Sequence, residues 1–147
     1  RWQAQQTVRA WQAHPAAVAR NAFERLLERG LARYAIRLAC RRHAGEHEVV
    51  WTPTGRRLIQ RGKDLTSVGY VIGVGGILAH AHEPEQILRL ATYREDEPAC
   101  LLPTDPTLLI DRCYLMYATG LLCEQHPNLA LRLLKQSLGV KESGGKA

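Results

Sequence analysis

The residues best placed to do chemistry in this chain gather in one glycine-rich stretch, residues 69–78, where an apolar run ends in Gly73-Val74-Gly75-Gly76. A run rich in Val and Ile, without polar alternation, predicts a parallel strand buried on both faces of an α/β sheet. Because glycine has no Cβ, a flat or anionic ligand could lie on the peptide planes at the strand end, where ligands of such sheets bind. The stretch therefore predicts a nucleotide-contacting turn. A tight turn that needs positive φ and contacts nothing is the alternative, and the glycines alone leave it open.

Two common nucleotide motifs do not fit the sequence. The glycine cluster has Leu78 where a dinucleotide fingerprint needs its third glycine, and the helix expected to open at Pro84 starts too late for that fingerprint. Gly62-Lys63 is not a phosphate loop, because Arg57 stands for the first glycine and Asp64 for the Ser or Thr that would hold magnesium. The sequence therefore argues against a Rossmann site, and it favours a loop that leads into a strand over a P-loop at Gly62-Lys63.

Histidines and cysteines do not form a convincing metal or catalytic site. His80 and His82 flank one alanine, and His43 and His47 are four apart but straddle a helix stop expected at Gly45, so they share no helix face. No Ser-His-Asp or Cys-His arrangement follows from the spacing. The cysteines have no close pairs and are expected to be free and buried; they are Cys40, Cys100, Cys113 and Cys123.

Length and composition suit one ordinary domain. The chain has 147 residues, 46% of them hydrophobic and 23% charged, and a net charge of +6. No apolar run approaches the length of a membrane span, so a soluble, cytoplasmic protein without a membrane partner is expected. A polar helix over residues 2–13 follows Arg1 instead of a methionine, which suggests that the chain begins inside something larger. Its Trp2 and Trp11 have no obvious partner and predict an exposed apolar strip where a missing lobe docks.

A long helix should begin at Pro15 and continue to His43, with one apolar face for nearly five turns. Gly30 lies on that face and would let another element approach closely. Arginines recur every four residues, a spacing that spreads them around a broad solvated face; they are Arg25, Arg29, Arg33, Arg37 and Arg41. Interleaved glutamates and the lack of stacking aromatics argue against a nucleic-acid partner.

The remaining elements are read from turn and capping signals. They are a hairpin of residues 48–52 and 57–60, a helix from Pro84 with a stripe of Ile87, Leu88 and Ala91, a turn-rich connection over 94–106 and a buried strand at 107–110. A further helix should face inward with Leu115, Ala118 and Leu122, with Cys123 as an additional candidate and Gly120 beside them. The last helix should run from Pro127 to Gly139 with Leu129, Leu133, Leu134 and Leu138 facing inward. Asp111 should cap the helix after the second strand. The tail, residues 141–147, should be disordered.

A family resemblance rests on an ordered set of motifs between about Ala35 and Leu138. They are Arg42-His43-Ala44-Gly45, Thr52-Pro53-Thr54-Gly55, Gln60-Arg61-Gly62-Lys63-Asp64-Leu65-Thr66, Tyr70-Val71-Ile72-Gly73-Val74-Gly75-Gly76, His80, Pro84-Glu85-Gln86-Ile87-Leu88, and Leu108-Leu109-Ile110-Asp111-Arg112-Cys113-Tyr114 with Gly120-Leu121-Leu122. This succession resembles the carboxy-terminal part of the glutamate mutase accessory proteins, the MutL or GlmL family of adenosylcobalamin-dependent mutase operons. That family is unrelated to the mismatch-repair protein of similar name.

The resemblance implies part of an actin-like, ribonuclease H-like ATPase lobe, with a mixed sheet and long amphipathic helices. It divides the chain into residues 1–14, a helix continuing a missing upstream lobe, residues 15–140, the carboxy-terminal actin-like subdomain, and the tail. Gly75-Gly76 matches the glycine pair that contacts adenosine, and the helix around Gly120 is similar to the superfamily's hinge helix. The implied cofactor is ATP with Mg, and the implied binding residues are Gly73, Gly75, Gly76, Ile77 and Gly120.

The same resemblance implies a chaperone-like ATPase that reactivates an adenosylcobalamin-dependent mutase by releasing damaged cobalamin. The implied partners are the missing upstream lobe and the mutase subunits, and the arginine-rich helix would line the adenine side. No residue here matches the family's phosphate-binding hairpins or magnesium-holding acids, so the chain alone is expected to be inactive. The alternative is a non-catalytic interaction domain whose basic helix binds an acidic partner.

Overall fold

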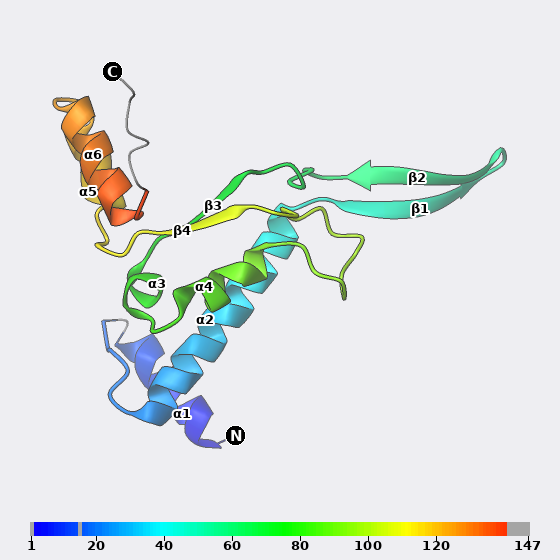
Figure 1. Ribbon diagram of the computed structural model, residues 1–147. Coiled ribbons are helices and arrows are strands. Elements are labelled where there is room, and N and C mark those ends of the chain that lie inside the picture. Colours follow the sequence, from blue (N-terminus) through cyan, green and yellow to red (C-terminus); the bar gives the residue numbers. More distant parts are fainter. Residues whose placement is uncertain (1, 15, 141–147) are drawn as a thin grey trace.

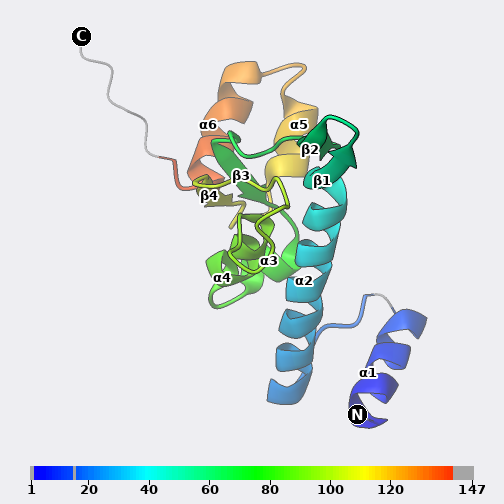
Figure 2. The same ribbon diagram turned by 90° about the vertical axis from the view of Figure 1, so that its right-hand side faces the viewer.

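A computed structural model describes residues 2–14 and 16–140 as a mixed α/β arrangement of helices and two small sheets (Figure 1). The expected tail, residues 141–147, lies outside the described residues. The long helix α2 runs beside the short helices α3 and α4, the hairpin of β1 and β2 projects from its far end, and α5 and α6 lie beyond β3 and β4 (Figure 2). No helix of the described part is both long enough and apolar enough to cross a membrane.

Helix α1 spans Trp2–Ala13 and helix α2 spans Ala22–His43. Pro15 itself lies outside the described residues, but residues 16–21 are not helical, so the prediction of a helix that continues from Pro15 is wrong. Asn21 caps α2: its Oδ1 accepts from the Glu24 amide at 2.9 Å, and a Glu24 carboxylate oxygen accepts from the Arg20 amide at 2.6 Å. This reciprocal pair satisfies two N–H groups of the helix start and fixes that start at Ala22. In α1, Trp2 is exposed and Trp11 half-buried.

Gly45 does not end α2. The helix closes at Ala44, which is extended, and Gly45 lies against the backbone that follows β2. A Cβ added at Gly45 would sit 2.4 Å from the Arg61 carbonyl oxygen and 2.7 Å from the Gly62 carbonyl carbon. At Gly30 the predicted close approach of another element does not occur, because a Cβ built there would meet no atom of another described element within 4 Å. The close approach predicted at Gly30 therefore occurs at Gly45.

The predicted hairpin is confirmed as β1 (Glu46–Thr52) and β2 (Gly55–Arg61), paired antiparallel from end to end. We call Glu46–Arg61 the arm, because it extends away from the helices (Figure 1). Backbone hydrogen bonds hold its base: His47 N–H donates to Ala99 at 2.8 Å, and Leu101 N–H donates to Gly45 at 2.8 Å. The turn-rich connection thus clamps the arm where it leaves the body.

Strands β3 (Tyr70–Gly73) and β4 (Thr107–Ile110) form a parallel pair, as their apolar composition predicts. The expectation that β3 is buried on both faces is wrong, because Tyr70 is 67% exposed and Ile72 41% exposed. Tyr70 and Ile72 are two residues apart and therefore share one face of β3, so within the described residues that face has no layer against it. Ile110, the last residue of β4, is buried in the core.

Helix α3 (Gly76–His80) begins directly after the glycine turn, so the expectation that no helix opens before Pro84 is also wrong. Helix α4 (Pro84–Leu88) begins at Pro84 as predicted and continues into the 3-10 helix η1 (Arg89–Ala91). The core joins these elements to β3 and β4 and to α2. Its buried members are Leu78, Ile87, Leu88 and Ile110, with Ala32 and Ile36 of α2 packed against them.

Helices α5 (Met116–Leu122) and α6 (Pro127–Ser137) pack together after β4. The inward side chains predicted for α5 are only half-buried, and Leu129 of α6 is 40% exposed instead of inward. All four cysteines are free, but Cys113 and Cys123 are exposed, which corrects the expectation that all are buried. Burial raises the pKa of the Cys40 and Cys100 thiols.

Asp111 is buried and caps the start of α5, as predicted. Its carboxylate accepts from the amides of Leu115 at 3.0 Å and Met116 at 2.8 Å, and from the Ser137 hydroxyl of α6. Burial raises the pKa of this carboxyl, but the hydrogen bonds from Ser137 and from the backbone outweigh burial and leave the pKa below its usual value. One carboxylate thus joins β4, α5 and α6.

We expect Asp111→Ala to lower the free energy of unfolding by about 2 kcal/mol, because it removes a helix cap and leaves the Ser137 hydroxyl unpaired. Since the folded-state pKa is depressed, this carboxylate's stabilisation is present above the unfolded pKa, about 3.9, and is lost as pH falls through the folded value. Urea midpoints at pH 7 and pH 3 measure both effects. Asp111→Asn should lose less stability than wild type between the two pH values, and an equal loss in both proteins would contradict this assignment.

Candidate functional site

A cavity of about 600 Å³ lies between the first half of α2 and the start of α3. It brings the predicted residues Gly76 and Ile77 together with Arg25 and Arg29 of α2. The rest of its lining comes from the segment between α1 and α2, from α2 itself and from the chain around α3 and α4; these residues are Ala17, Val18, Leu26, Glu28, His80, Ala81, His82 and Ile87. The lining of the cavity therefore combines apolar side chains with basic, acidic and imidazole groups.

Two of the three glycines of the turn, Gly75 and Gly73, are required, each for a different reason. Gly75 has φ +115°, a conformation that L side chains rarely adopt, and its carbonyl accepts from the amides of Leu78 and Ala79 at 3.0 and 2.9 Å. At Gly73 a Cβ would lie 2.8 Å from a methyl carbon of Leu78 and 3.1 Å from one of Leu88. The turn alternative thus accounts for Gly75, and core packing accounts for Gly73.

Gly76 differs from both neighbours. A Cβ at Gly76 would meet no described atom within 4 Å, and its φ lies outside the left-handed region. It lines the cavity, whereas Gly73 and Gly75 do not. The packing of the described chain therefore gives no reason for a glycine at position 76, although this residue lines the cavity and has open space around a built Cβ.

Arg29 is held at the edge of the cavity by groups from the chain before and within α4. Its Nη2 donates to a Glu83 carboxylate oxygen at 3.2 Å and to the Gln86 side-chain oxygen at 2.7 Å. Arg33, one turn further, reaches the Gln86 carbonyl at 3.5 Å. The prediction that the arginines form a solvated face is therefore wrong at these positions, because they bridge α2 to the chain around α4.

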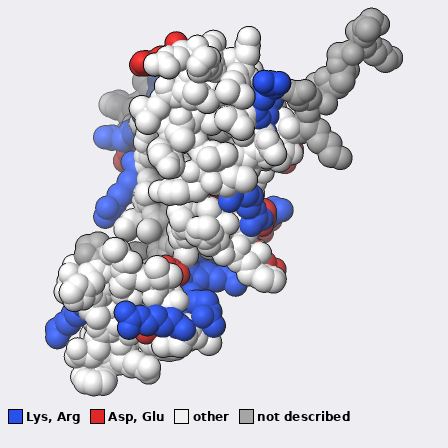
Figure 3. All heavy atoms as spheres, turned by 90° about the vertical axis from the view of Figure 1, so that its left-hand side faces the viewer, with Lys and Arg blue, Asp and Glu red and all other residues white. Residues whose placement is uncertain are grey.

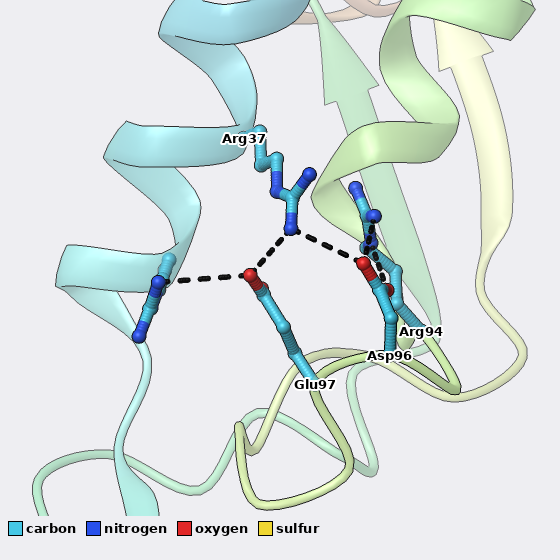
Figure 4. A network of polar contacts seen from close by, with 5 residues as sticks. Arg37, Arg94, Asp96 and Glu97 are labelled. Carbon is cyan, nitrogen blue, oxygen red and sulfur yellow. Dashed lines mark hydrogen bonds and ion pairs between the residues drawn. The ribbon is translucent and has the colours of Figure 1, made fainter.

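The carboxyl half of α2 makes a second set of ion pairs (Figure 4). Arg37 contacts Glu97 at 2.5 Å and Asp96 at 3.2 Å, Arg41 contacts Glu97 at 3.6 Å, and Arg94 contacts Asp96 at 2.6 Å. Hydrogen bonding from Arg37 lowers the pKa of Glu97, and hydrogen bonding from Arg94 lowers the pKa of Asp96. These contacts tie α2 to the connection that clamps the arm.

Gly120, the fifth predicted binding residue, lies exposed on α5 and does not line the cavity. A Cβ there would also meet no described atom within 4 Å. Sequence reasoning missed the contribution of Ala17 and Val18, although the Asn21-x-x-Glu24 capping signal could have placed them outside the helix. Within residues 2–14 and 16–140, no group of three His, Cys, Asp or Glu side chains could hold a metal ion.

On the face of the molecule that carries α1, α3, α5 and α6, basic side chains cover more of the surface than acidic ones (Figure 3). Wide uncharged areas separate the basic side chains. This face agrees with the net charge of +6. It would favour an anionic ligand approaching from this side over a cationic one.

The fold and cavity define a mixed α/β chain with a glycine turn beside an arginine-bearing helix, and comparisons with known proteins place it in a family. A family model described as MutL protein matches residues 1–138, and the chain belongs to this family. It is also 38% identical over 111 residues to Protein MutL of Clostridium tetanomorphum. That alignment covers 76% of this chain and 24% of the relative, so the chain spans about a quarter of that protein's length. No solved structure matches the chain.

Proposed function

We propose that this chain is the carboxy-terminal nucleotide-binding portion of a longer, actin-like ATPase that reactivates an adenosylcobalamin-dependent mutase such as glutamate mutase. Family membership supports a role of the MutL type. The resemblance of the motifs to the glutamate mutase accessory proteins supports the rest of the proposal, namely the actin-like fold, the ATPase activity and the mutase partner. In this proposal the upstream lobe of the longer protein closes over the cavity beside Gly76.

The single observation that carries the nucleotide proposal is the cavity that joins Gly76 and Ile77 to Arg25 and Arg29. A volume of about 600 Å³ falls in the range of small-molecule sites. A glycine without a packing role admits a flat base or ribose against the backbone. A guanidinium held by Glu83 and Gln86 can stack on an aromatic base or pair with a phosphate oxygen.

The described residues fit adenosine better than they fit the metal. Adenosine would be held by Gly76, Ile77 and the α2 arginines, whereas no acidic cluster of this part of the chain suits Mg²⁺. The magnesium ligands and the phosphate-binding hairpins would therefore come from the upstream lobe. When bound, ATP would supply the free energy for lobe closure and, after hydrolysis, for opening.

The test is a melting experiment on the natural longer protein with and without ATP and magnesium. A ligand at a hundred times its dissociation constant stabilises the folded state by about 2.7 kcal/mol, which shifts the melting temperature measurably. We expect such a shift with ATP. Its absence at millimolar ATP would favour the alternative function, an interaction domain whose arginine-rich helix binds an acidic partner. That alternative is weakened by the ion pairs that already engage Arg29 and Arg37 within the chain.

We predict that the 147-residue chain alone hydrolyses no ATP. Phosphoryl transfer needs a phosphate cradle and a metal-oriented nucleophile, and the adenosine wall supplies neither. A phosphate-release assay on the purified chain measures this directly. Magnesium-dependent turnover that disappears when a residue within the chain is changed would contradict the prediction.

A further inference from the structure

The arm carries an exposed apolar face near its tip. In the antiparallel register Val49 pairs with Leu58 and Trp51 with Arg56, so these four side chains share one face of the hairpin. Trp51 is 78% exposed, Leu58 62% and Val49 41%. We call this set, Val49, Trp51, Arg56 and Leu58, the arm face. No other helix or strand of the described chain packs on it, as the projecting ribbon in Figure 1 makes clear.

The tip of the arm is basic. Residues 49–58 contain Arg56 and Arg57 and no carboxylate. Within the described residues neither arginine makes an ion pair, whereas Arg61 at the base contacts Glu48 at 2.5 Å. The base is therefore locally neutralised and the tip carries two uncompensated positive charges beside an exposed indole.

The arm is also held in place at its root. The Gly45 amide donates to the Lys63 carbonyl at 2.6 Å, and the backbones at Gly45 and Gly62 approach so closely that neither position has room for a Cβ. Together with the clamp from Ala99 and Leu101, this contact fixes the direction of the hairpin. A surface that is already ordered loses little conformational freedom when a partner binds.

We infer that the arm face is a docking surface for another protein, one that presents an apolar pocket for Trp51 rimmed by carboxylates for Arg56. Arg57 pairs with Val50 on the opposite face of the hairpin and adds to the positive charge of the tip. Tryptophan and arginine are the residues that most often dominate binding energy at protein interfaces. The uncompensated charge selects an acidic partner surface. A single indole among aliphatic side chains is poor for single-stranded nucleic acid, which needs successive aromatic platforms. This inference is independent of the nucleotide proposal.

The experiment uses the natural longer protein and a fluorescein-labelled random copolymer of glutamate and leucine as the acidic, apolar probe, with binding followed by fluorescence anisotropy. We expect Arg56→Glu with Arg57→Glu to weaken binding at least tenfold. The matched control, Arg9→Glu with Arg132→Glu, makes the same charge change at two exposed arginines outside the arm and should weaken binding less than twofold. All four substituted side chains are exposed, and equal melting temperatures will show that the variants fold.

Trp51→Ala separates the apolar part of the surface from its charge. Wild type should bind the glutamate and leucine copolymer at least fivefold more tightly than polyglutamate, and Trp51→Ala should remove that preference. Equal binding by wild type and the arm double variant would overturn the proposal, as would equal weakening by the control pair. Tighter binding of labelled oligothymidylate, lost in the arm variant, would assign the arm to nucleic acid instead. Dimerisation in sedimentation runs that is lost in the same variant would assign the face to a second copy.

Discussion

Replacing Gly76 by valine should abolish the ATP-dependent rise in melting temperature of the natural longer protein while leaving the unliganded melt almost unchanged. The expected loss is the whole ligand stabilisation, about 2.7 kcal/mol at a hundred times the dissociation constant. The physical reason is that a Cβ at Gly76 meets no described atom within 4 Å but protrudes at the wall of the cavity. The branched side chain would occupy the volume proposed for the base or ribose.

Gly69→Val is the matched control for this substitution. Gly69 also has open space around a built Cβ and a φ outside the left-handed region, but it lies before β3 and does not line the cavity. Scanning calorimetry of the three proteins with and without ATP should show the shift in wild type and in Gly69→Val. An equal shift in Gly76→Val would remove Gly76 from the site and leave its glycine unexplained.

Gly45→Ala should cost about 3 kcal/mol of unfolding free energy or more, because the added Cβ would lie within 2.8 Å of three backbone atoms. Those atoms belong to residues 61–63 and cannot move away as a flexible side chain can. Separating the two backbones would also break the hydrogen bond from Gly45 to the Lys63 carbonyl at the root of the arm. Urea denaturation of the chain measures the change.

We expect Gly30→Ala, in contrast to Gly45→Ala, to stabilise the chain. Nothing lies within 4 Å of a Cβ at Gly30, and alanine is the better helix former, so this variant should be more stable than wild type by about 0.5–1 kcal/mol. If Gly45→Ala were as well tolerated as Gly30→Ala, the close contact at the root of the arm would not exist in solution.

Signals that lie within a few residues of one another predicted their elements correctly. Pro84 opens α4, Asp111 caps α5, and a turn flanked by two β-rich runs gives the arm. Each rests on local backbone preferences or on a side chain that bonds the next turn. The start of α2 differs from the prediction because the capping residues Asn21 and Glu24, and not a proline signal, decide where the helix begins.

Features that depend on distant parts of the chain could not be read from the sequence. Gly45 looked like a helix stop because its contact, the backbone at 61–63, follows a whole hairpin later. Arg29 and Arg37 looked solvated because their acidic partners lie 54 to 60 residues away. For the candidate site, the glycine turn was found directly, but only the folded arrangement separates Gly76 from Gly73 and Gly75 and leaves Gly120 outside the cavity.

Photolabelling of the natural longer protein with 8-azido-ATP would locate the adenine base, which we propose lies between the glycine turn and the arginines of α2. The modified peptides are then mapped by mass spectrometry. The azide sits on the base, so it marks whatever touches the base. We expect label in residues 17–29 or 76–82, the two stretches that line most of the cavity, and suppression of that label by unmodified ATP. Label that ATP suppresses but that falls only outside these two stretches would contradict the account.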